Sequence, residues 1–149
     1  METYLCHSGR ARDAHRPTLE FSVSATTRPP RGKEVNGREY YFISVDEFRK
    51  KVKNGEFVEW EEVYENQFYG TLKSEIDRIW KKNCHVVFDV DVKGGINLKN
   101  IYGTSAISIF IMPPSVKVLE ERLLCRATED RSKIKMRIEK AMAEMKLAN

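Results

Sequence analysis

Two apolar runs in the second half of the chain constrain its fold more than any other feature. Cys84–Val90 and Ala106–Met112 are mostly hydrophobic and have the length of single strands. Such runs are typical of strands that a sheet buries on both faces. Apolar residues recur at helical spacing in other segments, which are about 45–54, 71–80, 115–126 and 133–147. Strands separated by helices predict an α/β fold.

Short local signals place some of these elements more closely. Leu19–Ser24 alternates apolar and polar residues, which predicts a half-buried strand. Ser44, followed three residues later by Glu47, forms a capping box, so a helix is expected to begin there. The same helix is expected to end at Gly55, because glycine readily adopts the backbone conformation that closes helices. Thr71 is expected to cap the next helix.

Charge, hydropathy and cysteine spacing exclude several classes of protein. The net charge is only +4, from 26 basic and 22 acidic residues, and the two signs alternate, so a nucleic-acid surface is not indicated. No apolar run approaches the roughly 18–20 residues of a membrane span. The three cysteines are widely spaced without a Cys-x-x-Cys pair, which indicates neither a disulfide framework nor a zinc site. These features lead us to expect a cytoplasmic protein.

Residues 1–18 differ from the rest of the chain. They show neither helical nor strand periodicity, and their arginines and histidines stand among small polar residues. We therefore expect an irregular or disordered arm, followed by a single domain over residues 19–149. No pattern in the sequence indicates an oligomeric state.

A pair of arginines is the first candidate for a binding site. Arg28 and Arg31 lie in a loop that prolines stiffen, just after a predicted strand. Guanidinium groups bind phosphate oxygens through paired, charge-assisted hydrogen bonds, each worth about 1.5–3 kcal/mol. The loop is therefore a candidate phosphate site, and the alternative is a solvated basic turn.

Two carboxylates stand in apolar company and form the second candidate. Glu59 lies between Val58 and Trp60, and Asp89 ends the apolar run. A carboxylate in such a setting is costly unless it has a partner. The adjacent N–H donors on the edge of guanine could be that partner, with the hydroxyls of Ser24 and Thr71 beside them. Alternatively, Glu59 faces outward near a lysine and Asp89 caps a loop.

Phosphoryl-transfer chemistry is a third possibility. Asp91 follows Asp89 at the end of the buried strand, where many α/β enzymes place a residue that holds Mg²⁺ or its waters. Arg122 and Arg126 are four residues apart on one predicted helix and share a face, and Arg137 lies on the next helix. Helices that close can bring such cations to the moving phosphoryl group. The alternative is a solvated helix face.

The order of these features along the chain resembles a known family. The relevant segments are Phe21–Arg28, Gly37–Phe42, Gly55–Trp60, Tyr69–Thr71, Asp89–Asp91, Pro113–Ser115 and Arg122–Glu129. Over about residues 20–149 the sequence closely resembles the guanylate kinases. The resemblance implies the nucleoside monophosphate kinase version of the P-loop NTPase fold. That fold has a parallel core sheet, here truncated, a mixed-sheet GMP-binding subdomain over about 28–90 and a helical lid over about 115–138.

The resemblance also implies roles for individual residues. The residues that clamp the phosphate of GMP would be Arg28, Arg31, Tyr40 and Tyr69. The residues that read guanine would be Ser24, Glu59 and Thr71, with Asp89 beside them. The same pocket would also be lined by Glu34 and Gly70. The catalytic group would comprise Asp91, near the metal and the phosphates, and the lid arginines Arg122, Arg126 and Arg137.

The sequence departs from this family in two respects, at its N-terminal and C-terminal ends. The resemblance implies a further strand, an adenine-contacting turn and a closing helix after Asn149, so the C-terminal end of the family's domain is expected to be missing here. Such kinases hold the ATP phosphates in a Gly-x-x-x-x-Gly-Lys-Ser/Thr loop, and no stretch of these 149 residues has that pattern. The resemblance implies transfer of the γ-phosphoryl group of ATP to GMP, giving GDP and ADP, with impaired turnover in this chain. Mg²⁺ would arrive with ATP without a dedicated protein cage, and neither a nucleic acid nor a membrane is an expected partner. The alternative is a catalytically inactive module that binds GMP or a protein.

Overall fold

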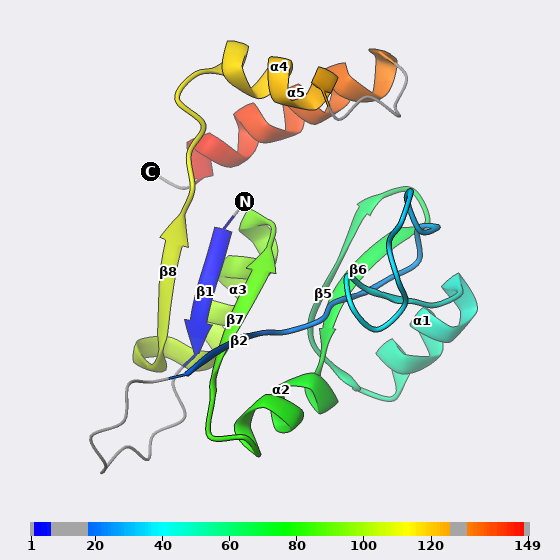
Figure 1. The fold of residues 1–149 in the computed structure, drawn as a ribbon, viewed down its shortest axis with the longest axis vertical. Helices are drawn as coiled ribbons and strands as arrows, with labels where there is room; N and C mark the ends of the chain where they lie inside the picture. Colours follow the sequence, from blue (N-terminus) through cyan, green and yellow to red (C-terminus); the bar gives the residue numbers. More distant parts are fainter. Residues whose placement is uncertain (1, 7–17, 126–130, 148–149) are drawn as a thin grey trace. The chain divides into compact units, whose positions relative to one another are not determined.

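The computed structural model describes residues 2–6, 18–125 and 131–147, which fall into two compact units. The larger unit runs from Glu2 to Ile109 and the smaller one from Phe110 onward. The elements of the larger unit are β1 (Glu2–Cys6), β2 (Leu19–Phe21), β3 (Ala25–Thr26), β4 (Tyr41–Phe42), α1 (Val45–Lys53), β5 (Phe57–Tyr64), β6 (Gln67–Leu72), α2 (Lys73–Trp80), β7 (His85–Val90), α3 (Val92–Tyr102), the short 3-10 helix η1 (Gly103–Ser105) and β8 (Ala106–Phe110), whose last residue begins the smaller unit (Figure 1). The smaller unit contains α4 (Val116–Cys125) and α5 (Arg131–Leu147), which pack against each other.

The first sheet of the larger unit is the core sheet, in the order β2-β7-β1-β8. β2 runs parallel to β7, as predicted, whereas β1 runs antiparallel to β7. The expected irregular arm was therefore wrong for residues 2–6, which pair with β7 along their whole length. β1 lies between β7 and β8, so backbone hydrogen bonds to its neighbours define it as a strand although its sequence shows no strand periodicity. Residues 7–17 lie outside the described part of the chain.

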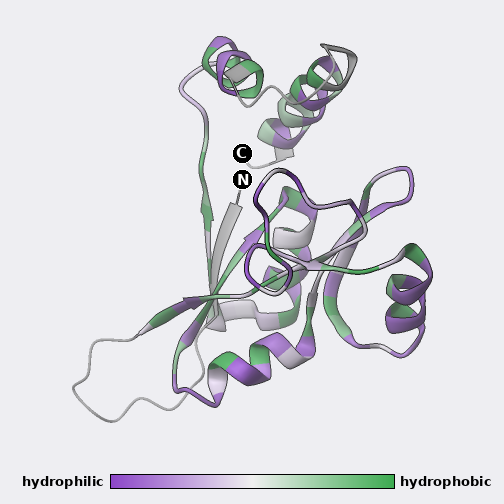
Figure 2. Cartoon of the chain, turned by 45° about the vertical axis from the view of Figure 1, so that its right-hand side comes forward, coloured by the Kyte–Doolittle hydropathy of each residue, from purple (hydrophilic) through white to green (hydrophobic). Residues whose placement is uncertain are grey.

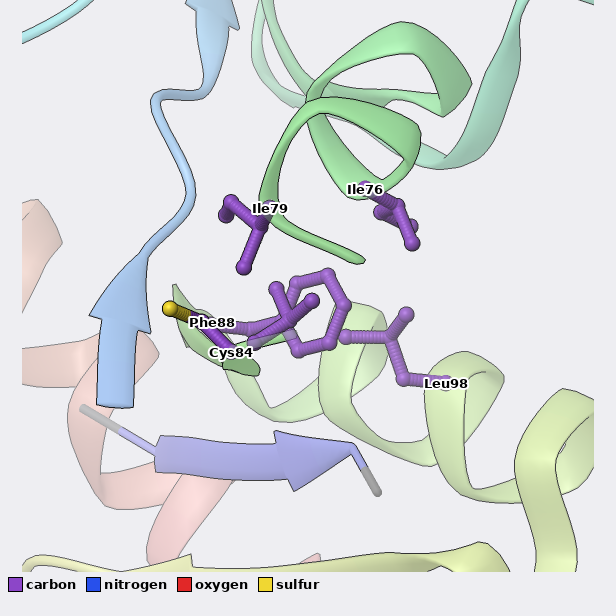
Figure 3. Close-up of a cluster of buried hydrophobic side chains, with 6 residues drawn as sticks. Ile76, Ile79, Cys84, Phe88 and Leu98 are labelled. Carbon is purple, nitrogen blue, oxygen red and sulfur yellow. The ribbon is translucent and has the colours of Figure 1, made fainter. Parts of the chain in front are cut away.

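Helices α2 and α3 pack against the core sheet around Phe88 (Figure 3). The ring of Phe88 is fully buried and lies between Ile76 and Ile79 of α2 and Leu98 of α3. Hydrophobic and hydrophilic residues alternate along α2, so one side of the helix faces this cluster and the other faces water (Figure 2). The first of the two apolar runs, Cys84–Val90, is thus buried as predicted. The prediction is wrong for the second run, Ala106–Met112, because Ile107, Ile109 and Ile111 are 62%, 46% and 56% exposed. This run forms β8, an outermost strand of the core sheet, so it is not enclosed as an inner strand is.

The first predicted strand forms, but its faces are reversed. Leu19 and Phe21 of β2 are 54% and 64% exposed, whereas Glu20 between them is half-buried. Glu20 points inward because it pairs with Arg78 on α2 and with Lys82 just beyond it. The alternation was recognised correctly, but the ion pairs decide which side of the strand faces the rest of the unit.

The second sheet, here called the subdomain sheet, has the order β4-β3-β6-β5. β3 is parallel to β4 and antiparallel to β6, and β6 is antiparallel to β5. This confirms the predicted mixed sheet. α1 covers one face of it through an aromatic cluster, in which the ring of Phe48 stacks on Phe57 at 4.3 Å and on Phe68 at 5.3 Å between centroids.

The predicted ends of α1 are confirmed, but the predicted cap of the next helix is not. The Ser44 hydroxyl accepts a hydrogen bond from the Glu47 N–H at 3.1 Å, and α1 ends just before Gly55, whose φ is +67°. α2 begins after Leu72 without a side-chain cap, because Thr71 is still part of β6. None of the helices in the described ranges has the length and hydropathy required to cross a membrane.

Candidate functional site

The face of the subdomain sheet opposite α1 carries the polar residues of interest. Side chains alternate along β6, so Tyr69 and Thr71 point away from the aromatic cluster that contains Phe68. Thr26 lies opposite Tyr69 on β3, and Glu59 lies opposite Thr71 on β5. Neighbouring strands thereby bring hydroxyl and carboxylate groups to one surface, here called the polar face.

A β-bulge separates Glu59 from the aromatic cluster. Phe57 and Trp60 both pack toward Phe48, although they are three residues apart and would lie on opposite sides of a regular strand. The register of β5 against β6 shifts between Phe57 and Glu59. The extra residue turns Glu59 onto the polar face, which is a common use of bulges beside functional sites.

Arg28 is held in place by Glu34. Its side chain is only 6% exposed, and its guanidinium donates two hydrogen bonds to the Glu34 carboxylate, at 2.6 and 2.7 Å. The Arg31 backbone N–H donates a third bond to the same carboxylate at 2.7 Å, while the Arg31 side chain is exposed. The bonds from Arg28 are the main reason that the pKa of Glu34 falls to about 2. The Arg28 pKa is raised in turn, so the pair is ionised at neutral pH.

Tyr40 and Tyr69 border this guanidinium. Arg28 lies over the Tyr40 ring at 4.8 Å from its centroid, and the two tyrosine rings meet edge-to-face at 6.0 Å. Burial is the main reason that the pKa of Tyr40 is raised, and the neighbouring Arg28 guanidinium opposes this rise. Asp89 stands near the end of β7, and partial loss of hydration raises its own pKa.

Glu59 is a buried carboxylate with few compensating contacts. It is 7% exposed, and its Oε1 accepts a hydrogen bond from the Thr71 hydroxyl at 2.8 Å. Burial raises its pKa to about 7, and the charge of nearby Asp91 adds to the rise. Asp91 caps α3, because its Oδ1 accepts from the Gly94 N–H at 2.9 Å.

The first turn of α3 fits closely against this carboxylate. A Cβ at Gly94 would lie 2.9 Å from Glu59 Oε2, which is inside normal contact distance. A glycine is therefore required for Glu59 and α3 to approach each other as they do. Sequence reasoning did not predict α3 or Gly94, because Gly94 and Gly95 in succession are unfavourable in a helix.

The other predicted residues take different positions. Ser24 is half-buried in the segment between β2 and β3. A Cβ at Gly70 would lie 2.8 Å from the Trp60 Cβ. The absence of a side chain at Gly70 therefore permits the close packing of β5 and β6. Arg122 is exposed on α4 and Arg137 is half-buried on α5, both in the smaller unit. Arg126 lies outside the described residues.

Similarity to known proteins identifies the family of this chain. Residues 12–148 match the family model described as guanylate kinase. A guanylate kinase of Porphyromonas gingivalis is 53% identical over 88% of this chain and 70% of the relative, and one of Bacteroides fragilis is 50% identical over 91% and 66%. This chain belongs to the guanylate kinase family. It spans about two thirds of the length of these curated relatives.

The fold agrees with this family assignment. The crystal structure of guanylate kinase from Anaplasma phagocytophilum matches with a TM-score of 0.64 and 28% identity, over 87% of this chain and 76% of that one. The larger unit of this family member brings together Arg28, Glu34, Tyr40 and Tyr69 as one cluster and Glu59, Thr71 and Asp91 as a second, whereas Asp89 is exposed near the end of β7. Within the described ranges, no group of three or more His, Cys, Asp and Glu side chains is arranged to hold a metal ion.

Proposed function

We propose that this chain binds GMP on the polar face of the subdomain sheet. The buried Glu59, held by Thr71 and shaped by the bulge in β5, is the observation that carries the proposal. Guanine offers two adjacent N–H donors that one carboxylate accepts together, whereas adenine offers no such pair. A carboxylate that burial has left poorly compensated gains from such a ligand, because the ligand restores hydrogen bonds lost from water.

The phosphate of GMP would bind to the neighbouring cluster. Arg28 is already fixed by Glu34 and by the Tyr40 ring, so little side-chain freedom is lost when the phosphate arrives. Arg31, Tyr40 and Tyr69 supply further donors beside it. Ser24 would complete the reading of the base. The GMP-binding subdomain proposed on these grounds covers about residues 28–90.

For the reaction, we propose the phosphoryl transfer of the family. A phosphate oxygen of GMP forms a bond to the γ-phosphorus of ATP, and the bond between that phosphorus and ADP breaks. The lid, about residues 115–138, would supply the cations Arg122, Arg126 and Arg137. Mg²⁺ would arrive with ATP, since it needs only one or two carboxylates when phosphates supply other ligands. Asp91, whose Oδ1 caps α3, would take that limited role.

Turnover by these 149 residues alone is expected to be low. They contain no Gly-x-x-x-x-Gly-Lys-Ser/Thr stretch, and phosphoryl transfer depends on positioned charges around the ATP phosphates. The same observation favours a second candidate, a module that holds GMP without turning it over. A coupled assay of GMP-dependent ADP release separates the two candidates.

The buried free thiol of Cys84 supports our further proposal of a cytoplasmic location.

Calorimetric titration with GMP and AMP tests the binding proposal. We expect the chain to prefer GMP, and Glu59→Gln to reduce that preference at least tenfold, since sites built on buried hydrogen bonds discriminate by up to about 10⁴ or more. Glu62→Gln is the matched control on the same strand, because its side chain can still accept the Asn66 N–H bond. Equal binding of GMP and AMP by the unaltered chain would contradict the proposal.

A further inference from the structure

Two segments carry the chain between the core sheet and the subdomain sheet. Residues 22–24 lead from β2 to β3, and α2 leads from β6 back to β7 (Figure 1). Ser24 stands at the end of the first crossing, and Glu75 lies in the second, within the first turn of α2. Any contact between the two crossings limits how one sheet can turn against the other.

Glu75 makes such a contact through Oε2, which accepts from the first crossing, while its Oε1 bonds to β4. The side chain is 4% exposed. Oε2 accepts from the Val23 backbone N–H at 3.0 Å and from Arg78 Nη2 at 3.0 Å, and Oε1 accepts from the Tyr41 hydroxyl at 2.8 Å and from Arg78 Nε at 2.9 Å. Four donors therefore meet one buried carboxylate, and they come from the first crossing, from β4 and from α2 itself.

These bonds form a closed circuit around Ser24. Val23, immediately before Ser24, is held by Glu75. The Ser24 carbonyl accepts from the Tyr41 N–H at 2.9 Å, and the Tyr41 hydroxyl returns to Glu75. Ser24 is thus fixed from both sides, through its own carbonyl and through its neighbour, although Glu75 binds no atom of Ser24 itself.

The charge of Glu75 is well supported. Burial alone would raise its pKa, but the bonds from Arg78, Val23 and Tyr41 outweigh burial and lower the pKa. Arg78 also pairs with Glu20 on β2, and Lys82 bonds to Glu20 at 3.0 Å, so the network extends back to the core sheet. A buried ion pair of this kind adds little net stability compared with apolar packing. Its contribution is better explained by the orientation that its bonds impose.

We propose that Glu75 is a positioning residue that holds Ser24, by way of Val23 and Tyr41, where its hydroxyl can read the guanine of GMP. The inference rests on the proposed function, because it requires GMP to bind on the polar face. It assigns a role in base selection to a residue outside the binding face and to a tyrosine, Tyr41, that is distinct from the pair Tyr40 and Tyr69.

A double-mutant cycle on GMP affinity tests this inference. Tyr41→Phe removes the hydroxyl bond and keeps the ring, and we expect it to weaken GMP binding roughly threefold to tenfold, as the loss of one such bond commonly does. Ser24→Ala should also weaken binding. If Tyr41 acts through the Ser24 hydroxyl, the double variant should bind about as weakly as Ser24→Ala alone, because coupled positions are not additive.

Two more variants complete the experiment. Glu75→Gln keeps the shape of the side chain but removes its charge, and we expect it to weaken GMP binding as Tyr41→Phe does. It replaces Tyr41→Phe in the test if Tyr41→Phe proves poorly folded. Lys82→Ala is the control, since it alters only the outer end of the same network. We expect it to leave GMP affinity unchanged, and circular dichroism melting checks that every variant is folded.

The possible outcomes distinguish the proposed role of Glu75 from the proposed binding of GMP, on which it rests. Failure of the unaltered chain to bind GMP would overturn the proposed function and this inference with it. Normal GMP binding by Tyr41→Phe and Glu75→Gln would overturn the inference alone. Additive losses in the double variant would do the same, because they would show that Tyr41 affects GMP binding independently of the Ser24 hydroxyl.

Discussion

At the scale of single residues, the site depends on how one carboxylate is kept both buried and available. Glu59 reaches the polar face through the bulge in β5, is held by Thr71 and packs against the glycine at 94. The need of Glu59 for a binding partner was predictable from its apolar neighbours in the sequence. The orientation of Glu59 was not, because simple alternation would place it on the same side as Phe57, and a bulge depends on the partner strand.

The raised pKa of Glu59 predicts opposite pH dependences for binding and for stability. Guanine requires the ionised carboxylate as an acceptor, so GMP affinity should rise with pH across about pH 6–8, around the Glu59 pKa of about 7. In the free protein the group binds protons more tightly when folded, so its contribution to the free energy of unfolding should fall as pH rises from about 4.5 to 7.

Calorimetry and urea denaturation at several pH values measure both trends. Glu59→Gln is the control, because glutamine does not titrate. In this variant the contribution of position 59 to both pH dependences should be absent. A pH-independent GMP affinity in the unaltered chain, in the presence of clear binding, would contradict the assignment of Glu59 as the acceptor.

Gly94→Ala should separate stability from binding. The added Cβ would meet Glu59 Oε2 at 2.9 Å, and this oxygen is the end of a flexible side chain that can move away. Alanine in a helix is favoured over glycine by about 0.5–1 kcal/mol, which offsets the cost of that movement. We therefore expect little change in urea stability but clearly weaker GMP binding. Lys93→Ala, at an exposed position in the same turn, should change neither.

At the scale of elements, local signals were sufficient where an element stabilises itself. α1 begins and ends where its capping residues predict, and the apolar run that became β7 is buried. β1 and α3 were missed for physical reasons, since β1 is defined by its pairing with β7 and the two successive glycines of α3 are unfavourable in a helix taken alone. The reversed faces of β2 have a similar origin in the pairing of Glu20 with α2.

Loss of the α1 cap should destabilise the subdomain sheet without altering the polar face. Ser44→Ala removes the acceptor for the Glu47 N–H, and we expect a loss of about 0.5–2 kcal/mol in the free energy of unfolding. Ser44→Asp retains an acceptor and should restore most of that loss. Urea denaturation measures both variants, and GMP affinity under native conditions should stay constant. Equal stability of the alanine and aspartate variants would show that the cap contributes nothing.

At the scale of the whole molecule, the residues proposed for GMP binding and the lid arginines proposed for phosphoryl transfer belong to different units, while Asp91 lies in the same unit as the GMP site. The polar face, Ser24 and α3 all lie within Glu2–Ile109, whereas Arg122 and Arg137 belong to the smaller unit. A unit with its own sheets and core can retain a binding site without help from the other. GMP binding and phosphoryl transfer should therefore respond to different substitutions.

Arg122→Gln tests this separation. The guanidinium is exposed on α4, and its proposed role begins only when ATP is bound and negative charge moves between the nucleotides. We expect the GMP dissociation constant to stay within about twofold, because surface substitutions usually change free energies by less than about 0.5 kcal/mol. Whatever ADP release the unaltered chain shows should fall at least tenfold. Arg49→Gln, an exposed arginine on α1, is the matched control and should alter neither quantity. Weaker GMP binding in Arg122→Gln would instead mean that α4 contributes directly to the GMP site.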